Sequence, residues 1–362
     1  MYIGDSVNNR VRKVLVATGA ITTIAGTGTA GYSGNNGQAT AAMIKYPCGV
    51  NLDIAGNVYF GDWGVGSYNV IRKITVSTGV ISTVAGTGST SGGYNSDNIQ
   101  ATAATLNYPF DVVLDSYGNL YIADYNNNRV RKVTISTGVI TTIVGTGTAT
   151  STGDGSAATS ATINTPCNIQ FDSAGNLYIT EDVGDRVRKV ITVSTEIPTA
   201  APSRSPTYYP SLSPHSISVI STIAGTGTGS YSGDEGQATS AAIYNPHGIA
   251  LDSSGNVFFS DLENRRVRKI TSSTGIITTY AGTGSASYGG DGGVASSAAI
   301  YHNHGLCIDS AGGILYDSVT FLSYSTLPRQ LVHRGLLQLS YSQGDGVNDY
   351  NFNDCGNGNG WL

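Results

Sequence analysis

Residues 166–190 read P-C-N-I-Q-F-D-S-A-G-N-L-Y-I-T-E-D-V-G-D-R-V-R-K-V, and this stretch contains most of a unit that recurs along the chain. Its final motif, R-V-R-K followed by Val or Ile, returns at 10–14, 129–133 and 266–270, and residues 70–74 read V-I-R-K-I. The tripeptide G-T-G follows each copy, beginning at residues 26, 86, 145, 225 and 282. A long unit repeated in tandem indicates a repeat architecture, which decides the fold before any local feature is considered.

Each repeat contains four short runs of β-forming residues. In the third copy they are D-V-V-L-D (111–115), N-L-Y-I-A-D (119–124), R-V-R-K-V (129–133) and V-I-T-T-I-V-G (139–145). Gly and Asn between the runs supply the positive φ that tight hairpins require. Four antiparallel strands per tandem repeat predict the blades of an all-β β-propeller.

The repeat resembles a known family. The succession P-x-G-[IV], then D-x-x-G-N-[LV]-[YF]-[IF], then N-x-R-V-R-K is similar to the NHL repeat. The added segment of the type G-Y-S-G-D-x-G-x-A-T, represented by residues 230–241, resembles a long-loop subtype of that family. The resemblance covers roughly residues 1–316. It implies a propeller, typically six-bladed, that binds proteins, RNA or peptides.

Both ends of the repeat region look incomplete. Residues 1–317 are predicted to form the propeller, and the first repeat lacks its first strand. We expect 305–309 (G-L-C-I-D) to supply that strand, which gives four full blades and one composite closing blade. Residues 318–362 abandon the pattern, although a shift of one base would permit G-N-L-Y-I-A-D, R-I-R-K-V and T-I-A-G-T-G in that order. We interpret this tail as a frame-shifted blade or a disordered segment, and a repaired tail would allow six blades.

A Pro- and Ser-rich insertion interrupts the fourth full repeat at residues 194–216. It replaces the Thr-Gly turn between the third and fourth strands, and its composition predicts an extended loop. Together with the low content of charged residues, 12%, this loop favours an extracellular location.

The composition excludes some classes of partner. The formal net charge is −5, and no basic run is clustered as nucleic-acid binding requires. No apolar run is long enough to span a membrane. Because the chain also lacks G-x-S-x-G, P-loop and H-E-x-x-H motifs, we predict a monomer with no cofactor and no catalytic residue.

The candidate site lies where the first strands begin. Connections between strands two and three share a face of a propeller with those that lead to the next blade, so the long loops crowd one face. Loops on a rigid scaffold are where binding residues concentrate. We therefore predict that a protein or peptide ligand contacts the residues near the repeat proline on this face. They are Phe110, His247, His304, Tyr46, Tyr108, Tyr244 and Tyr301.

Two alternatives were weighed against this prediction. His247, His304, Cys48 and Cys167 are residue types that bind zinc, so a metal-dependent propeller lyase or lactonase with a site at the central channel is the alternative function. The repeated acids Asp62, Asp124, Asp182 and Asp261 are expected to cap turns or to pair with the arginines of R-V-R-K. The loops S-G-D-E-G (232–236) and G-G-D-G-G (289–293) lack calcium-ligand spacing, and Asx-turns account for their aspartates.

Overall fold

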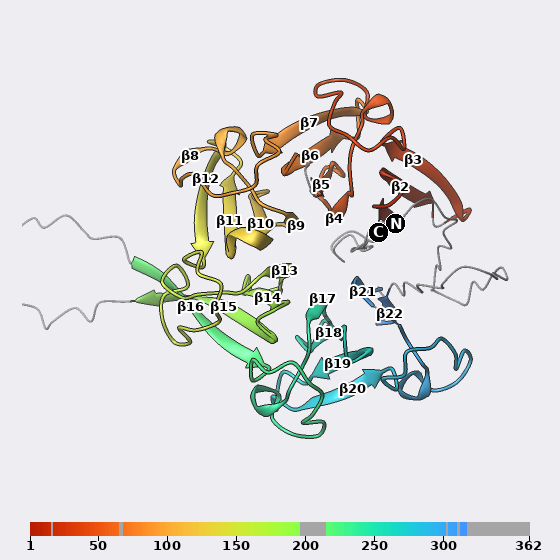
Figure 1. Ribbon diagram of the computed structural model, residues 1–362, viewed down its shortest axis with the longest axis vertical. Helices are drawn as coiled ribbons and strands as arrows, with labels where there is room; N and C mark the ends of the chain where they lie inside the picture. The colour runs from red at the N-terminus through yellow and green to blue at the C-terminus, as the bar shows by residue number, and fades with distance from the viewer. Residues whose placement is uncertain (16, 65–67, 196–214, 302, 310–311, 317–362) are drawn as a thin grey trace, which may run out of the picture.

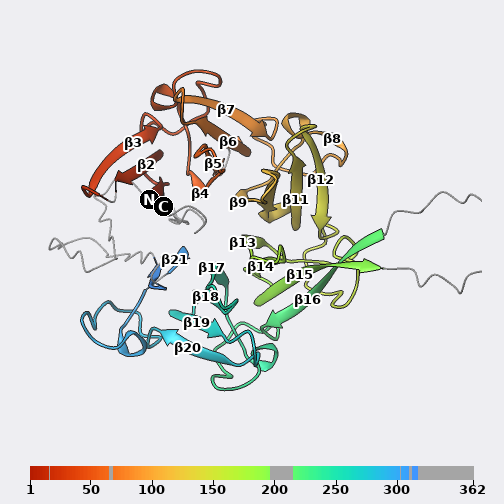
Figure 2. The ribbon, with the colours of Figure 1, turned by 180° about the vertical axis from the view of Figure 1, so that it is seen from behind.

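The computed structural model describes the chain except for residues 16, 65–67, 196–214, 302, 310–311 and 317–362. The described residues form antiparallel sheets arranged in a ring (Figure 1; Figure 2 shows the ring from behind). The all-β propeller that the repeats predict is confirmed. Within the described residues, no helix has the length and apolar character needed to cross a membrane.

The third repeat shows how the sequence becomes a blade. It forms β9 (Pro109–Leu114), β10 (Leu120–Asp124), β11 (Arg129–Thr134) and β12 (Val139–Val144), joined in that order. A short strand, β8 (Ile99–Gln100), adds to the outer edge of β12. The β9–β10 hairpin closes because Asp115 Oδ1 accepts the Asn119 N–H at 2.9 Å, while Gly118 takes a φ of 80°. The predicted four-strand pattern is therefore the observed one, with bounds within two residues.

The remaining sheets repeat this order around the ring (Figure 1). Three of them have four strands, one has three and one has two. Their strands are β1 (Tyr2–Asp5), β2 (Arg10–Leu15) and β3 (Ala20–Ala25); β4 (Cys48–Leu52), β5 (Val58–Asp62), β6 (Val70–Thr75) and β7 (Val80–Ala85); β13 (Pro166–Phe171), β14 (Leu177–Glu181), β15 (Arg186–Thr195) and β16 (His215–Ala224); β17 (Pro246–Leu251), β18 (Val257–Asp261), β19 (Arg266–Ile270) and β20 (Ile277–Ala281); and β21 (Leu306–Ile308) and β22 (Ile314–Tyr316).

Two parts of the chain lie at the limits of the described residues. The insertion predicted at 194–216 falls between β15 and β16, which pair as far as Thr195 and His215 and extend beyond the ring (Figure 1). Its residues 196–214, and the predicted tail at 318–362, lie outside the described residues.

The ends of the repeat region pair differently from the predicted closure. Residues 305–309 were expected to complete the first sheet, but β21 pairs with β22 through Cys307 and Leu315. Among the described strands, β1 pairs only with β2, so the first sheet has three strands. Instead of closing the first blade, β21 and β22 form a further two-stranded sheet between β17–β20 and β1–β3 (Figure 2).

The hydrophobic core lies between neighbouring blades. Val130 and Val144 of one blade pack with Ile169 and Ile179 of the next, all of them buried. The connecting loop adds Ile163 to the same cluster. Most loops also contain a single turn of 3-10 helix whose first alanine is buried. The turns are η1 (Ala39–Ala41), η2 (Ala101–Ala103) and η4 (Ala238–Ser240), with η5 (Ala295–Ser297) more exposed and η3 (Tyr125–Asn127) in a β10–β11 connection.

A fully buried arginine organises each four-stranded blade. Arg131 of β11 lies 3.5 Å from Asp124 at the end of β10 and 2.9 Å from Asp97 in the preceding loop. Arg72 pairs with Asp62, and Arg268 with Asp261, at the same positions. The predicted pairing of repeated acids with the R-V-R-K arginines is thus confirmed for Asp62, Asp124 and Asp261.

The prediction is wrong for Asp182. Its place in the repeat is taken by Glu181, which lies 2.9 Å from the buried Arg188. The adjacent letters E-D allowed a shift of one residue in the sequence alignment. The Asx-turn interpretation of the loop aspartates is incomplete for a related reason. Asp234 of S-G-D-E-G, like Asp97 and Asp154, forms an ion pair with the arginine of the following blade.

Replacement of Arg131 by Met should lower the free energy of unfolding by about 3–5 kcal/mol, because the buried Asp124 then lacks its cationic partner. Lys132→Met is the matched control. Its ammonium is 28% exposed and lies 3.9 Å from Asp115, so it should cost less than about 1 kcal/mol. Denaturant unfolding of both variants measures the difference. Equal losses would show that the buried arginine has no special weight.

Candidate functional site

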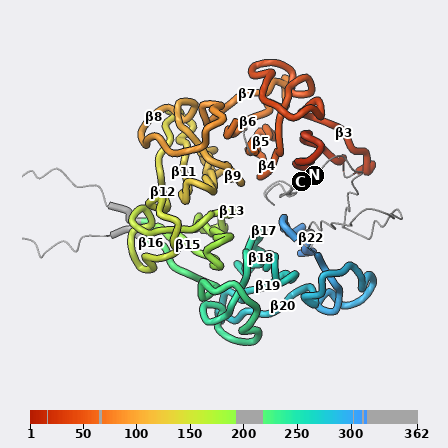
Figure 3. Tube along the Cα trace, viewed as in Figure 1, coloured from red at the N-terminus to blue at the C-terminus, as the bar shows by residue number. Residues whose placement is uncertain are grey.

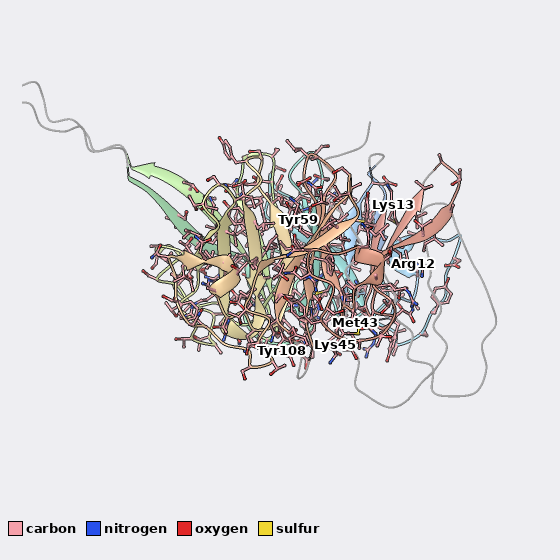
Figure 4. All side chains as sticks on the ribbon, turned by 90° about the horizontal axis from the view of Figure 1, so that it is seen from above. Arg12, Lys13, Met43, Lys45, Tyr59 and Tyr108 are labelled. Atoms are coloured by element: carbon pink, nitrogen blue, oxygen red, sulfur yellow. The ribbon has the colours of Figure 1, made fainter. Side chains whose placement is uncertain are left out.

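The long connections between blades lie around the rim and crowd one face of the ring (Figure 3). Figure 4 views the ring from its side and places Met43, Lys45 and Tyr108 on that face, with Tyr59 on the opposite one. We call the face of Met43, Lys45 and Tyr108 the loop face. It is the face on which the sequence predicts a ligand.

The backbone of the loop face is strained just before the first strands. Tyr46 has a φ of 44° and Tyr108 a φ of 57°, values that aromatic residues rarely adopt. The preceding blade holds them there, because Asn69 Oδ1 accepts the Tyr108 N–H at 3.0 Å and Asn9 Oδ1 accepts the Tyr46 N–H at 3.3 Å. Asn245 takes the same conformation in β17's blade, with a φ of 50°.

Five aromatic side chains near this backbone contact one another. The ring of Trp63 lies 4.7 Å from Tyr108, 5.6 Å from Phe110 and 6.4 Å from Tyr46, between ring centroids. Phe110 stacks on Tyr125 at 5.5 Å. Phe110 and Trp63 are buried, whereas the three tyrosines are partly exposed. We call Tyr46, Trp63, Tyr108, Phe110 and Tyr125 the aromatic row.

The aromatic row continues into a chain of polar groups. Tyr125 donates its hydroxyl to Asp182 Oδ2, and Asp182 Oδ1 lies 3.4 Å from His247 Nε2. His247 Nδ1 is 3.3 Å from His304 Nδ1. Burial acts to raise the pKa of Asp182, but the charge and hydrogen bonds of His247 and Tyr125 hold it below its ordinary value. The structure therefore joins Phe110, His247 and His304 in one network.

Two predicted tyrosines lie apart from this network. Tyr244 is one position earlier in its repeat than Tyr108, is 41% exposed and packs beside Gly229. Tyr301 occupies the equivalent position of the next repeat, and its ring lies 5.7 Å below the Arg265 guanidinium. The four predicted tyrosines thus fall into two classes, of which Tyr46 and Tyr108 belong to the aromatic row.

Sequence reasoning missed Trp63, Tyr125 and Asp182. All three stand directly after the acid that ends the second strand, at equivalent positions of consecutive blades. The register brings that position close to the first strand, since Asp124 pairs with Pro109. Variation at this position was the signal that the sequence offered.

The predicted metal ligands are only partly brought together. Cys48 and Cys167 are buried, and burial raises the pKa of both thiols. Cys167 Sγ lies 3.2 Å from the Pro246 carbonyl oxygen, and Cys48 Sγ contacts Trp63 Nε1. Over the part of the chain that the structure describes, no three His, Cys, Asp or Glu side chains are grouped so as to share an ion. His247 and His304 are the pair that lies close together.

Asp111 is a buried acid at the start of an inner strand, next to Phe110. It joins two blades, because its Oδ2 accepts the Ile169 N–H at 3.0 Å and the Asn168 side-chain N–H at 3.3 Å. Burial raises the pKa of Asp111 to about 6 despite these hydrogen bonds. Its carboxylate is thus the titratable link between β9 and β13.

Comparison with known proteins supports the repeat assignment. A family model described as NHL repeat matches residues 106–133, and one described as Teneurin NHL domain matches residues 220–289. Mouse teneurin-4 is 23% identical over 277 residues, which cover 68% of this chain and 8% of teneurin-4. Human NHL repeat-containing protein 2 is 27% identical over 151 residues, 40% of this chain and 20% of that protein. The chain thus spans less than a quarter of these relatives.

A solved structure from Bacteroides thetaiotaomicron, of a protein of unknown function, has a TM-score of 0.52 with 19% identity. The match covers 87% of this chain and 66% of the other. At this level of identity, the similarity supports the fold.

The raised pKa of Asp111 predicts a pH dependence of stability. Because the folded state binds this proton more tightly than the unfolded state, the free energy of unfolding should fall as pH rises from about 4 to 6. A rise from 3.8 to about 6 corresponds to about 3 kcal/mol. Burial raises the pKa of Asp62, Asp124 and Asp261 as well, so Asp111→Asn should remove only part of the slope. Denaturant unfolding at several pH values measures this.

Asp53→Asn is the control of opposite sign. Burial acts to raise the pKa of Asp53, but hydrogen bonds from Asn57 and Tyr59 lower it below its ordinary value. The stability it contributes is present above about pH 4 and is lost as pH falls further. Its replacement should leave the slope between pH 4 and 6 unchanged. An unchanged slope in Asp111→Asn as well would contradict the raised pKa.

Proposed function

Because the chain belongs to the NHL-repeat proteins, we propose that its propeller is a non-catalytic module that binds a protein or peptide on the loop face. The ligand would lie across the aromatic row and reach the network of His247 and His304. The propeller would act as a monomeric scaffold for this surface.

The aromatic row carries the proposal. Tyr and Trp are the side chains most often found at the energetic centre of protein interfaces, since they combine a large apolar area with a polar tip. Here Trp63 and Phe110 form a buried floor, and Tyr46, Tyr108 and Tyr125 expose their edges around it. A floor of this kind suits the apolar side chains of an extended peptide.

The strained tyrosine backbones support the same conclusion. A residue held at an unfavourable positive φ costs on the order of 1 kcal/mol and persists only where its surroundings fix it. Tyr46 and Tyr108 are held in this way although Asn would meet the backbone requirement, as Asn245 does. The aromatic rings are therefore the property that these positions add.

The charges near the aromatic row favour a polypeptide over a nucleic acid. Asp111 and Asp182 are buried beside it, and both would repel phosphates at neutral pH. Lys45 lies over the Tyr46 ring at 5.6 Å, which leaves its ammonium at the edge of the site. A ligand with apolar side chains and a basic group beside Asp182 matches this distribution.

The aromatic row predicts the result of a peptide selection. Peptides selected from a displayed random library against the full chain should bind Tyr46→Asn/Tyr108→Asn at least about tenfold more weakly. Asn removes both rings but tolerates the positive φ, so thermal stability should be kept. Tyr117→Asn is the control, since Tyr117 is 84% exposed at the β9–β10 turn, away from the loop face. Equal binding by all three proteins would reject the aromatic row as the binding surface.

Metal content separates the binding module from the metal-dependent lyase. We expect far less than one zinc or calcium ion per chain after equilibration with either metal, because two histidines alone make an incomplete site. Elemental analysis of the full chain and of His247→Ala/His304→Ala measures this. One ion per chain that the double replacement abolishes would favour the lyase.

A further inference from the structure

The long loops recognise pairs of arginines in a repeated way. In the loop before β17, Tyr231 donates to Asp234 Oδ2 at 2.8 Å, and Asp234 Oδ1 lies 2.7 Å from Arg268 Nη2. The Tyr231 ring also lies 3.7 Å from the guanidinium of Arg266 and 5.0 Å from that of Arg268, measured to the ring centroid. One tyrosine and one aspartate, three residues apart, thus hold both arginines of R-V-R-K.

The loop before β9 uses the same contacts. The Tyr94 ring lies 3.8 Å from Arg129 and 4.9 Å from Arg131, and Asp97 lies 2.9 Å from Arg131. In both blades the arginines belong to the third strand of the sheet that the loop precedes. The tyrosine–aspartate pair is therefore a recognition unit for an extended R-x-R segment.

A further copy of this unit precedes β21. Tyr288 donates to Asp291 Oδ2 at 2.7 Å, which reproduces the contact between Tyr231 and Asp234. The loop is held in the same form, since Ala299 N–H donates to the Gly289 carbonyl at 2.9 Å. Tyr288 is 50% exposed and Asp291 is exposed.

The arginines that this unit would bind are missing from the described residues. None of the ion pairs found across the described chain involves Asp291. The sheet that follows the loop consists of β21 and β22, and β22 pairs with β21 alone among the described strands. The third-strand position, where the other blades place R-x-R, lies along the far edge of β22.

We propose that Tyr288 and Asp291 form a binding site for an extended peptide segment with two arginines spaced R-x-R. The segment adds to β22 as a third antiparallel strand, as β19 adds to β18 through Asp261 and Arg266. Main-chain hydrogen bonds to β22 supply part of the affinity, and the two side chains supply the selectivity. Tyr288 stacks on the first arginine, and Asp291 forms a charge-assisted hydrogen bond with the second.

Arginine is required rather than lysine in this geometry. The planar guanidinium stacks on the tyrosine ring and reaches a carboxylate with a fixed fork of donors, whereas an ammonium does neither as well. The two arginines of R-x-R also lie on the same side of a strand, because side chains alternate between its faces. One face of the added strand therefore meets both Tyr288 and Asp291.

The probe is a labelled synthetic peptide with the sequence of residues 263–272, E-N-R-R-V-R-K-I-T-S. Fluorescence anisotropy with the full chain at physiological salt should give saturable binding. Asp291→Asn should weaken it on the order of tenfold or more, and Tyr288→Leu should weaken it as well. Glu235→Gln is the matched control, because Glu235 is an exposed acid of a sister loop that holds no arginine. A peptide with Arg266→Gln and Arg268→Gln should not bind.

Amide hydrogen exchange locates the bound strand. Protection should rise at Ile314–Tyr316 when the peptide is added. Protection at Val257–Asp261 instead would mean that the peptide exchanges with β19, and it would overturn the proposal. Absence of binding, or binding that Asp291→Asn leaves unchanged, would overturn it too, since the latter shows attraction to the net acidic surface alone.

Discussion

The propeller depends on an arginine that is removed from water in every four-stranded blade. Arg131, for example, is fully buried and lies between Asp124 of its own sheet and Asp97 of the preceding loop. A buried guanidinium is tolerated only where carboxylates and hydrogen bonds replace its hydration. The loop must therefore wrap the blade in one fixed way. This ion pair links the local sheet to the long connection and holds that connection on the rim.

This fixed framework leaves two neighbouring positions free to vary. One follows the acid at the end of the second strand, and the other follows the proline at the start of the first. They lie side by side because Asp124 pairs with Pro109 in the hairpin register. Their occupants change around the ring, from the aromatic Trp63 and Phe110 to the polar Asp182 and His247. A graded surface is thus built on a repeated backbone.

The sequence predicted the fold well because repetition samples the same signals several times. It also predicted the correct face, with Phe110, His247 and His304 in one network. It did not reveal Trp63, Tyr125 or Asp182, because their contacts cross between blades; Tyr125 and Asp182 are 57 residues apart. The adjacent letters of Glu181 and Asp182 misled the alignment, since only strand register shows that Glu181 meets Arg188. Closure by residues 305–309 failed likewise, because pairing partners at a sheet edge depend on geometry that local patterns do not contain.

Assembly of the aromatic row and the His247 network from several blades couples binding to the integrity of the ring. Tyr46, Tyr108 and His247 belong to three sheets, and each is positioned in part by residues of a neighbouring sheet. A ligand that contacts all three binds only when the sheets are in register. Such a ligand stabilises the folded ring by RT ln(1 + [L]/Kd), and it does so at the junctions between blades, where the hydrophobic clusters lie. Binding on the loop face and closure of the propeller are therefore parts of one equilibrium.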